Sequence, residues 1–427
     1  MRSTISYTNT YMTVEKNKSY CRVPFDSVTV SPTGRMQLCC EAQWTGGSEK
    51  TKIKDVQSIK DWFDGEYLTG VRKSMLAGIK LPECETCYKR EKIHKKSTRK
   101  YINEKYFAHN NDIIEHSIKK IDLKLGNKCN LKCKMCFPYA SSELWKEWKE
   151  LGWNSKNKDP NKETSWKYYD GYFEEDYSWP KQKSNMDKIK EAAVQSKLIH
   201  VTGGEPTLNP EFFDLMQYCI DTDSAKDIVL DVTTNATKIH PRFFDMARKF
   251  KHLILIISMD GVGKTYEYVR YPANYNVVYA NILRYNKFVK SLGGESKLVF
   301  NFVLQMWNLH NAVDVITTLA PLAVNSESDS VRIEELLDPT FMQWGMLPAD
   351  YIKDVIRNIA KTEKQVQDKA TKWPIIAFAK MLGAFTLYKT KDHVYQKDQL
   401  VAFMNKQDQH RRIHIQDYIP ELVDFFS

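Results

Sequence analysis

The chain has 427 residues, 42% hydrophobic and 12% aromatic, which is enough for a large core and more than one structural unit. It contains no run of about 18 apolar residues and no apolar stretch near residue 1, so we expect no membrane span, no secretory signal and a cytoplasmic protein. The formal charge of +10 comes from lysines spread along the sequence, which indicates a solvated surface more than a nucleic-acid site.

Residues 1–112 contain five of the nine cysteines in the chain, a number that favours metal or redox chemistry in a reducing compartment. Alternation over residues 28–38, with a turn at 31–34, predicts a β-hairpin that ends at Cys39 and Cys40. A helix is predicted over 59–76, before the C-x2-C pair Cys84 and Cys87. If these elements fold together, Cys21 and three later cysteines can meet at one metal ion or cluster.

Residues 121–125 alternate apolar and polar side chains, which predicts a strand, and Gly126 ends the pattern. The following loop carries Cys129, Cys133 and Cys136 in a C-x3-C-x2-C spacing. Three thiolates would leave one corner of a four-iron cluster open to a ligand that is not protein. A partial zinc site is the alternative that the spacing leaves open.

From about residue 115 to 340, strands and helices alternate, which predicts a parallel sheet. A helix capped by Ser141 or Ser142 follows the cysteine loop, and further strands are expected at 197–201, 228–234, 253–258, 298–304 and 331–336. Six strands fit a partial (β/α)6 TIM-type barrel in an α/β fold, where ligands bind at the carboxyl ends of the strands. The second strand runs directly into Gly203-Gly204-Glu205-Pro206. Its glycines allow close approach of backbone to a ligand, and the carboxylate can accept hydrogen bonds from an ammonium group.

The cysteine spacing, together with this glycine motif on the next strand, resembles the radical S-adenosylmethionine (SAM) superfamily. The resemblance implies a 4Fe-4S cluster held by Cys129, Cys133 and Cys136, whose open iron is chelated by SAM. It implies reductive cleavage of SAM to a 5'-deoxyadenosyl radical that abstracts a hydrogen atom. The residues that it implies for SAM lie at strand ends: Thr202, Gly203, Gly204, Glu205, Pro206, Thr234, Asn235, Ser258, Asp260, Arg270 and Asn301. Each of the residues after Pro206 is equally well explained as an ordinary capping or loop residue. The resemblance also implies that Met135 packs on adenine, at a position where the family often has an aromatic residue.

The N-terminal cysteines resemble a twitch or SPASM-type auxiliary module. This module precedes the barrel here, whereas in most relatives the module follows the barrel. Gly34-x4-Cys39 fits its pattern, so Cys39 is preferred to Cys40, together with Cys21, Cys84 and Cys87. The resemblance implies a second 4Fe-4S cluster, with a structural zinc ion as the alternative. It also favours a peptide or protein substrate over a nucleoside, nucleic acid or carbohydrate, and an electron donor such as flavodoxin or ferredoxin.

The expected organisation is a small cysteine-rich α+β module at 1–112, a barrel at 113–340 and a helical region at 341–427, which either closes the barrel or docks a partner. The aromatic insertion at 152–183 is either a lid over the substrate or a packed surface segment. No general base stands out, and the oligomeric state is open. A zinc-stabilised nucleic-acid-binding protein is the alternative from another class, but it makes the two motifs a coincidence. A degenerate barrel that binds SAM without turnover is a third reading.

Overall fold

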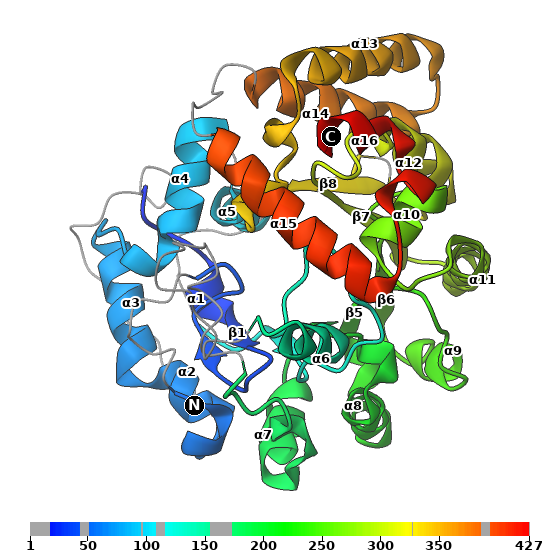
Figure 1. The fold of residues 1–427 in the computed structure, drawn as a ribbon. Coiled ribbons are helices and arrows are strands. Elements are labelled where there is room, and N and C mark those ends of the chain that lie inside the picture. Colours follow the sequence, from blue (N-terminus) through cyan, green and yellow to red (C-terminus); the bar gives the residue numbers. More distant parts are fainter. Residues whose placement is uncertain are drawn as a thin grey trace.

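The computed structural model describes residues 18–42, 51–94, 97–107, 116–153, 173–326, 328–385 and 393–426. Its centre is an eight-stranded sheet of order β2-β1-β3-β4-β5-β6-β7-β8 (Figure 1). Six consecutive strands run parallel, which confirms the predicted α/β class and parallel sheet. They are β3 (Lys120–Lys124), β4 (Leu198–Thr202), β5 (Val229–Thr234), β6 (His252–Ser258), β7 (Lys297–Leu304) and β8 (Val331–Glu335).

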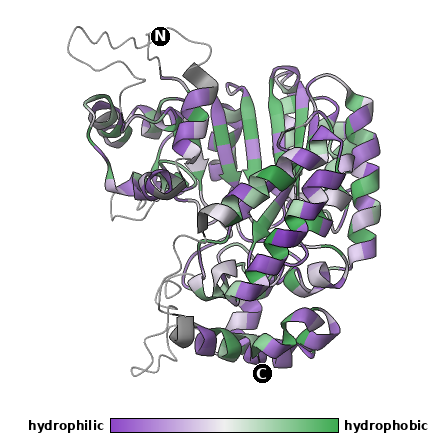
Figure 2. Ribbon diagram, turned by 90° about the horizontal axis from the view of Figure 1, so that it is seen from above, coloured by the Kyte–Doolittle hydropathy of each residue, from purple (hydrophilic) through white to green (hydrophobic). Residues whose placement is uncertain are grey.

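Helices follow these strands and pack around the outside of the sheet (Figure 1). They are α6 (Ser142–Glu150), α7 (Lys183–Ala193), α8 (Pro210–Asp221), α9 (Phe243–Ala247), α10 (Gly263–Val269), α11 (Tyr275–Leu292) and α12 (Ala312–Leu319). Burial alternates along β4 and β5, so one face of each strand is buried and the other is half-buried. Figure 2 accordingly shows hydrophobic and hydrophilic residues along the same strands.

The predicted hairpin forms from β1 (Ser27–Val30) and β2 (Met36–Gln37), preceded by α1 (Val23–Asp26). However, β1 also pairs in parallel with β3, in a register that places Val28 opposite Ile121. All four residues of β1 are buried. The hairpin is therefore an extension of the barrel sheet, where the sequence predicted a separate module.

The helix predicted over residues 59–76 is two helices, α2 (Ile59–Asp64) and α3 (Glu66–Leu76). Gly65 separates them with ψ of 170°, an extended conformation that no helix continues through. Two further helices are α4 (Glu85–His94), which begins after Cys84 and contains Cys87, and α5 (Thr98–Phe107). Both helices bury apolar residues, α2 in contact with α7 and α3 in contact with α1.

The C-terminal residues form α13 (Ala349–Gln365), α14 (Lys369–Phe385), α15 (His393–Arg411) and α16 (Val423–Phe426). The sequence predicted a helical region at 341–427, and within it α15 crosses in front of the barrel in Figure 1. Its buried residues include Gln407, Asp408 and Arg411 as well as Leu400 and Phe403. A buried face with this many polar groups gives no apolar periodicity. Within the described ranges, no helix has the length and apolarity needed to cross a membrane.

Candidate active site

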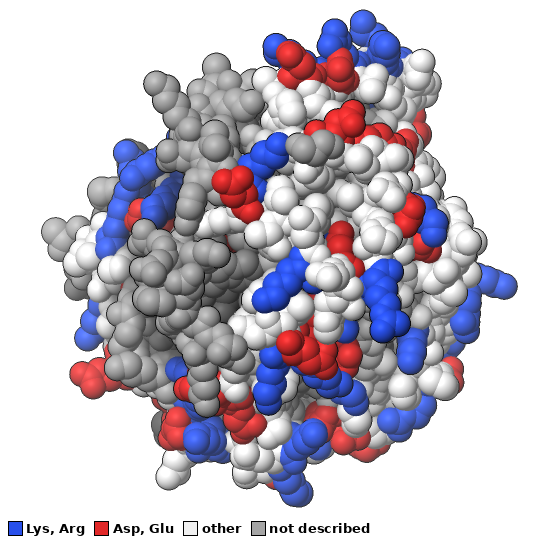
Figure 3. Space-filling model, viewed as in Figure 1, with Lys and Arg blue, Asp and Glu red and all other residues white. Residues whose placement is uncertain are grey.

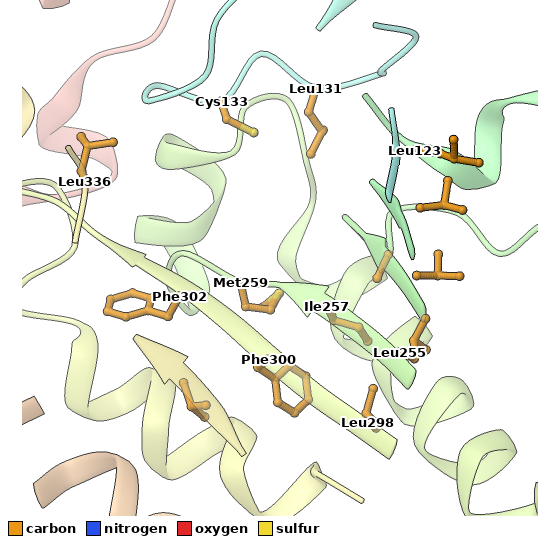
Figure 4. Packing of buried hydrophobic residues seen from close by; sticks show 14 of the residues in the cluster. Leu123, Leu131, Cys133, Leu255, Ile257, Met259, Leu298, Phe300, Phe302 and Leu336 are labelled. Atoms are coloured by element: carbon orange, nitrogen blue, oxygen red, sulfur yellow. The ribbon is translucent and has the colours of Figure 1, made fainter. Parts of the chain in front are cut away.

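The three-cysteine loop begins at the carboxyl end of β3, with Cys133 buried and Cys129 and Cys136 half-buried. The start of α6 fixes this loop. Ser141 caps the helix by accepting from the Leu144 amide and donates to the Leu131 carbonyl at 2.6 Å, while Ser142 exchanges hydrogen bonds with the backbone of Cys129. Figure 4 shows Leu131 and Cys133 with their side chains directed from the loop toward the strands.

The glycine motif packs directly against the beginning of this loop. Gly203 and Gly204 have φ of +79° and +59°, and a Cβ on Gly204 would lie 2.4 Å from the Lys128 carbonyl oxygen. The Glu205 amide donates to that same oxygen at 2.7 Å. Only glycine combines this backbone conformation with so close a contact. The two motifs recognised in the sequence therefore form one packed unit at neighbouring strand ends.

The Glu205 carboxylate is buried and already accepts four hydrogen bonds. Thr207 donates through its amide and its hydroxyl, Thr234 donates its hydroxyl at 2.7 Å, and Asn235 donates its amide at 2.6 Å. Burial raises the pKa of Glu205, although these hydrogen bonds favour the charged form. The carboxylate thus joins the ends of β4 and β5. Because Oε1 accepts three of the four hydrogen bonds, an ammonium group would be accepted by Oε2 or by nearby backbone carbonyls.

Asn235 connects the end of β5 to the cysteine loop. Its side-chain amide donates to Asn130 at 3.1 Å and lies 3.9 Å from the Cys129 sulfur, while its oxygen accepts from Thr237. Asn130 in turn donates to the Thr237 hydroxyl. The sequence placed Thr234 and Asn235 in the site, and the structure brings both to the loop and the glycine motif.

The ends of β6 and β7 provide a buried ion pair and unpaired polar atoms. Arg270 lies 2.7 Å from Asp260, which also accepts from the Val303 amide. Ser258 and Asn301 are half-buried register partners on β6 and β7. Arg270 Nε and Asn301 Oδ1 are buried and have no hydrogen-bond partner within the described residues. The resemblance implied that Arg270 binds the cofactor. In the structure, the Arg270 guanidinium already pairs with the Asp260 carboxylate.

Burial dominates the electrostatic environment of the three cysteines. Burial raises the pKa of Cys136 to about 12 and also raises the pKa of Cys129 and Cys133, with Arg270 opposing the rise at Cys133. Deprotonation of such thiols needs a metal to bind them. No three His, Cys, Asp or Glu side chains in the described ranges converge on one ion position. A cluster sets a looser requirement, because its thiolates bind different irons.

Helix α15 secures the loop from the other side through two buried charge pairs that the sequence did not reveal. Lys134 pairs with Asp408, which also accepts from the Tyr268 hydroxyl at 2.8 Å. Arg411 binds both oxygens of Glu147 at 2.7 and 2.9 Å and donates to the Lys132 carbonyl at 2.7 Å. The C-terminal region is thus part of the wall of the candidate site.

Among the N-terminal cysteines, Cys84 and Cys87 act electrostatically on Cys21, and Cys39 is acted on by Cys40, Cys21 and Cys84. Within the described ranges they do not converge on one ion position. Arg99 is buried beside Cys21 and Cys84. The main charged neighbours of Cys40 are instead Asp122 and Lys124 of β3. The choice of Cys39 over Cys40 stays a prediction from the sequence pattern.

The predicted lid lies partly outside the described residues, because 154–172 are not among them. Its later part is anchored to the N-terminal hairpin. Glu175 pairs with Arg35 and, at 2.9 Å, with Lys52, and the Trp179 indole donates to the Pro32 carbonyl at 3.0 Å.

Polar side chains on the inner face of the sheet were also missed by the sequence analysis. Asp122, His200 and Asp231 are direct register partners on β3, β4 and β5. The available signal was the presence of charged residues inside parallel strands, which are usually apolar on both faces.

On the outer surface, Lys, Arg, Asp and Glu intermingle over the described part of the face in Figure 3. The positive excess on this face is spread out and does not form one block, in line with the expectation of a solvated surface.

Residues 123–315, less than half of the chain, match the family model described as Radical SAM superfamily. An uncharacterized protein of Methanocaldococcus jannaschii is 31% identical over 148 residues, which cover 34% of this chain and 40% of the relative. Among solved structures, anSMEcpe with bound AdoMet is similar with a TM-score of 0.36 and 16% identity, over 58% of this chain and 60% of that one. SuiB of Streptococcus suis bound to S-adenosylmethionine gives 0.34 and 12%, over 70% and 61%. At these values the structural likeness carries no information on a substrate.

The match assigns a radical SAM domain to the part of the chain that contains the cysteine loop, the glycine motif and the strand ends described above. Both motifs lie within the matched residues, as the resemblance to radical SAM enzymes implies.

Proposed function

We propose that the protein uses a 4Fe-4S cluster at Cys129, Cys133 and Cys136 to cleave SAM reductively, and that it modifies a peptide or protein. When bound, the cluster and SAM supply an electron and a 5'-deoxyadenosyl radical for hydrogen abstraction. The observation that carries this proposal is the packing of Gly204 and Glu205 onto the cysteine loop within a matched radical SAM domain.

The residues of this chain bind and orient the cofactor. Gly203 and Gly204 leave the backbone open for close approach, and Thr202 and Pro206 flank it at the end of β4 and the start of the next turn. The unpaired atoms Arg270 Nε and Asn301 Oδ1 provide a donor and an acceptor for polar groups of SAM. Met259, Phe302 and Leu336 belong to the apolar core that continues up to Cys133, and this core excludes water from below the loop (Figure 4).

At the second cysteine set, Cys21, Cys39, Cys84 and Cys87 hold an auxiliary 4Fe-4S cluster, with zinc as the alternative. Their mutual proximity and the buried Arg99 guanidinium, which favours thiolates, support a metal there. The twitch or SPASM resemblance of this set is what favours a peptide or protein substrate. A small flavoprotein or ferredoxin-type donor in the cytoplasm would supply the electron.

The test is the iron, sulfide and zinc content of anaerobically reconstituted protein, with 5'-deoxyadenosine formation under dithionite. We expect about eight irons per chain, falling to about four in a Cys129/Cys133/Cys136 triple alanine variant that makes no 5'-deoxyadenosine. Cys219→Ala is the matched control, because Cys219 is buried in α8 away from both sets and its loss should leave the iron unchanged. About four irons plus one zinc would make the auxiliary site structural. Zinc alone in both proteins would refute the proposal.

A further inference from the structure

A row of ionisable side chains crosses the inner face of the sheet, one step below the strand ends that carry the cysteine loop and the glycine motif. Asp122 on β3 is opposite His200 on β4, which is opposite Asp231 on β5. Lys124 is next along β3 and opposite Thr202, the residue before the glycines. The residue before each member of this row is apolar. These residues, Ile121, Ile199 and Leu230, are register partners of one another, are buried, and face the opposite side of the sheet.

Strand geometry explains why these side chains point inward together. Successive residues of a strand face opposite sides, so a row of register partners shares one face. Asp122 is only 5% exposed, whereas Lys124, His200 and Asp231 are half-buried. The row is therefore mostly enclosed, and three of its four residues keep some exposure.

The row is incompletely satisfied by the protein itself. His200 Nδ1 lies 3.2 Å from Asp231 Oδ1, and Lys124 Nζ lies 3.5 Å from Asp122 Oδ1. Within the described ranges these four buried atoms make no hydrogen bond of good geometry, and each faces only its ion-pair partner. Leaving a buried polar atom without a hydrogen bond costs about 1–3 kcal/mol. The two ion pairs offset part of this cost, and the hydrogen-bonding capacity that they leave unused is available to an incoming ligand.

The chemistry of the unpaired atoms limits the ligand class. Asp122 and Asp231 offer acceptors, Lys124 offers donors, and His200 can act as either. With neutral histidine the four groups carry one net negative charge, so neither a strong anion nor a strong cation is specified. A group that carries both a donor and an acceptor matches them, and the peptide amide is such a group.

We propose that Asp122, Lys124, His200 and Asp231 form the substrate-contacting floor of the barrel and bind an amide group of a peptide segment. This assignment rests on the proposed function, because it names the substrate contact of the same active site. The four residues are specificity-determining, and they position the peptide below the cofactor.

The experiment uses reconstituted, SAM-loaded protein and observes the His200 imidazole by NMR, assigned with His200→Gln. The probes are N-acetylglycine N-methylamide and N-acetylasparagine N-methylamide, with guanosine as a comparison. We expect a saturable shift of the His200 signal with both amides. Asp122→Asn and Asp231→Asn should each weaken this binding by about tenfold, since each removes a charge-assisted hydrogen bond. Asp245→Asn is the control, because Asp245 is 84% exposed on α9 and should leave binding unchanged.

The inference is overturned if neither amide shifts the His200 signal, if both variants bind as wild type does, or if guanosine binds more tightly than the amides. Circular dichroism identifies a variant that fails to fold, and the other variant then decides. Formation of 5'-deoxyadenosine by the same wild-type sample separates the two claims. Amide binding without 5'-deoxyadenosine formation would refute only the proposed function. Formation of 5'-deoxyadenosine without amide binding would refute only this inference.

Discussion

The Arg411 and Glu147 pair allows a quantitative test of how α15 holds the cysteine loop. The two side chains are 1% and 0% exposed and are joined by two hydrogen bonds. Arg411→Met would leave the Glu147 carboxylate buried with weaker partners, namely Gln407 at 3.0 Å and Lys132 at 3.4 Å. Breaking a buried pair from one side costs about 3–5 kcal/mol. Because two partners remain, we expect the lower end, about 3 kcal/mol.

The assay is urea unfolding of wild type, Arg411→Met and the double variant Glu147→Gln/Arg411→Met. The double variant should recover most of the loss, because neutral partners remove the uncompensated charge. Arg357→Met is the matched control. Arg357 pairs with Asp354 on α13 with both side chains more than 60% exposed, so its loss should cost less than about 1 kcal/mol. An Arg411→Met protein as stable as wild type, or a double variant no more stable than the single one, would refute this reasoning.

Two further outcomes follow. Burial alone would raise the pKa of Glu147, but the hydrogen bonds and charge of Arg411 and its neighbours lower this pKa below the usual 4.5. The contribution of Glu147 to the folded state is therefore complete above about pH 4.5 and is lost as the pH falls through the lower folded-state pKa. Urea midpoints measured from pH 6 to 3 should fall more steeply for wild type than for Glu147→Gln/Arg411→Met, and parallel curves would contradict this. Gly204→Ala should lower the urea midpoint clearly, because its Cβ meets the Lys128 carbonyl at φ of +59°, whereas Gly70→Ala in α3, where a Cβ meets nothing within 4 Å, should raise stability by about 0.5–1 kcal/mol. Equal midpoints for the two alanine variants would show that the glycine motif tolerates displacement from the loop.

Local patterns predicted much of the barrel. Each parallel strand was placed within one or two residues, because short apolar runs alternate regularly with helices over residues 115–340. The Ser141 cap and the adjacency of the glycine motif to the cysteine loop also followed from sequence spacing. These features depend on neighbours that are close in the chain or on the next strand.

Contacts between distant segments could not be read in the same way. Lys134 and Asp408 are 274 residues apart, and nothing in either segment indicates that both are buried. The polar residues Asp122 and His200 were consistent with a strand that faces solvent, because alternation does not tell which side of a sheet closes into a barrel. The pairing of β1 with β3 likewise depends on tertiary packing and not on the hairpin sequence.

That pairing has a consequence for the integrity of the domain. Strand β3 would otherwise be the first strand of the barrel, with a row of unpaired backbone amides and carbonyls beside the buried side chains of Ile121 and Leu123. β1 covers this edge along four residues, and the two-residue β2 leaves only a short edge beyond it. A fragment beginning at residue 113 would keep the cysteine loop and the glycine motif but expose the unpaired backbone groups of β3. We therefore expect the barrel to self-associate when it is separated from its N-terminal hairpin.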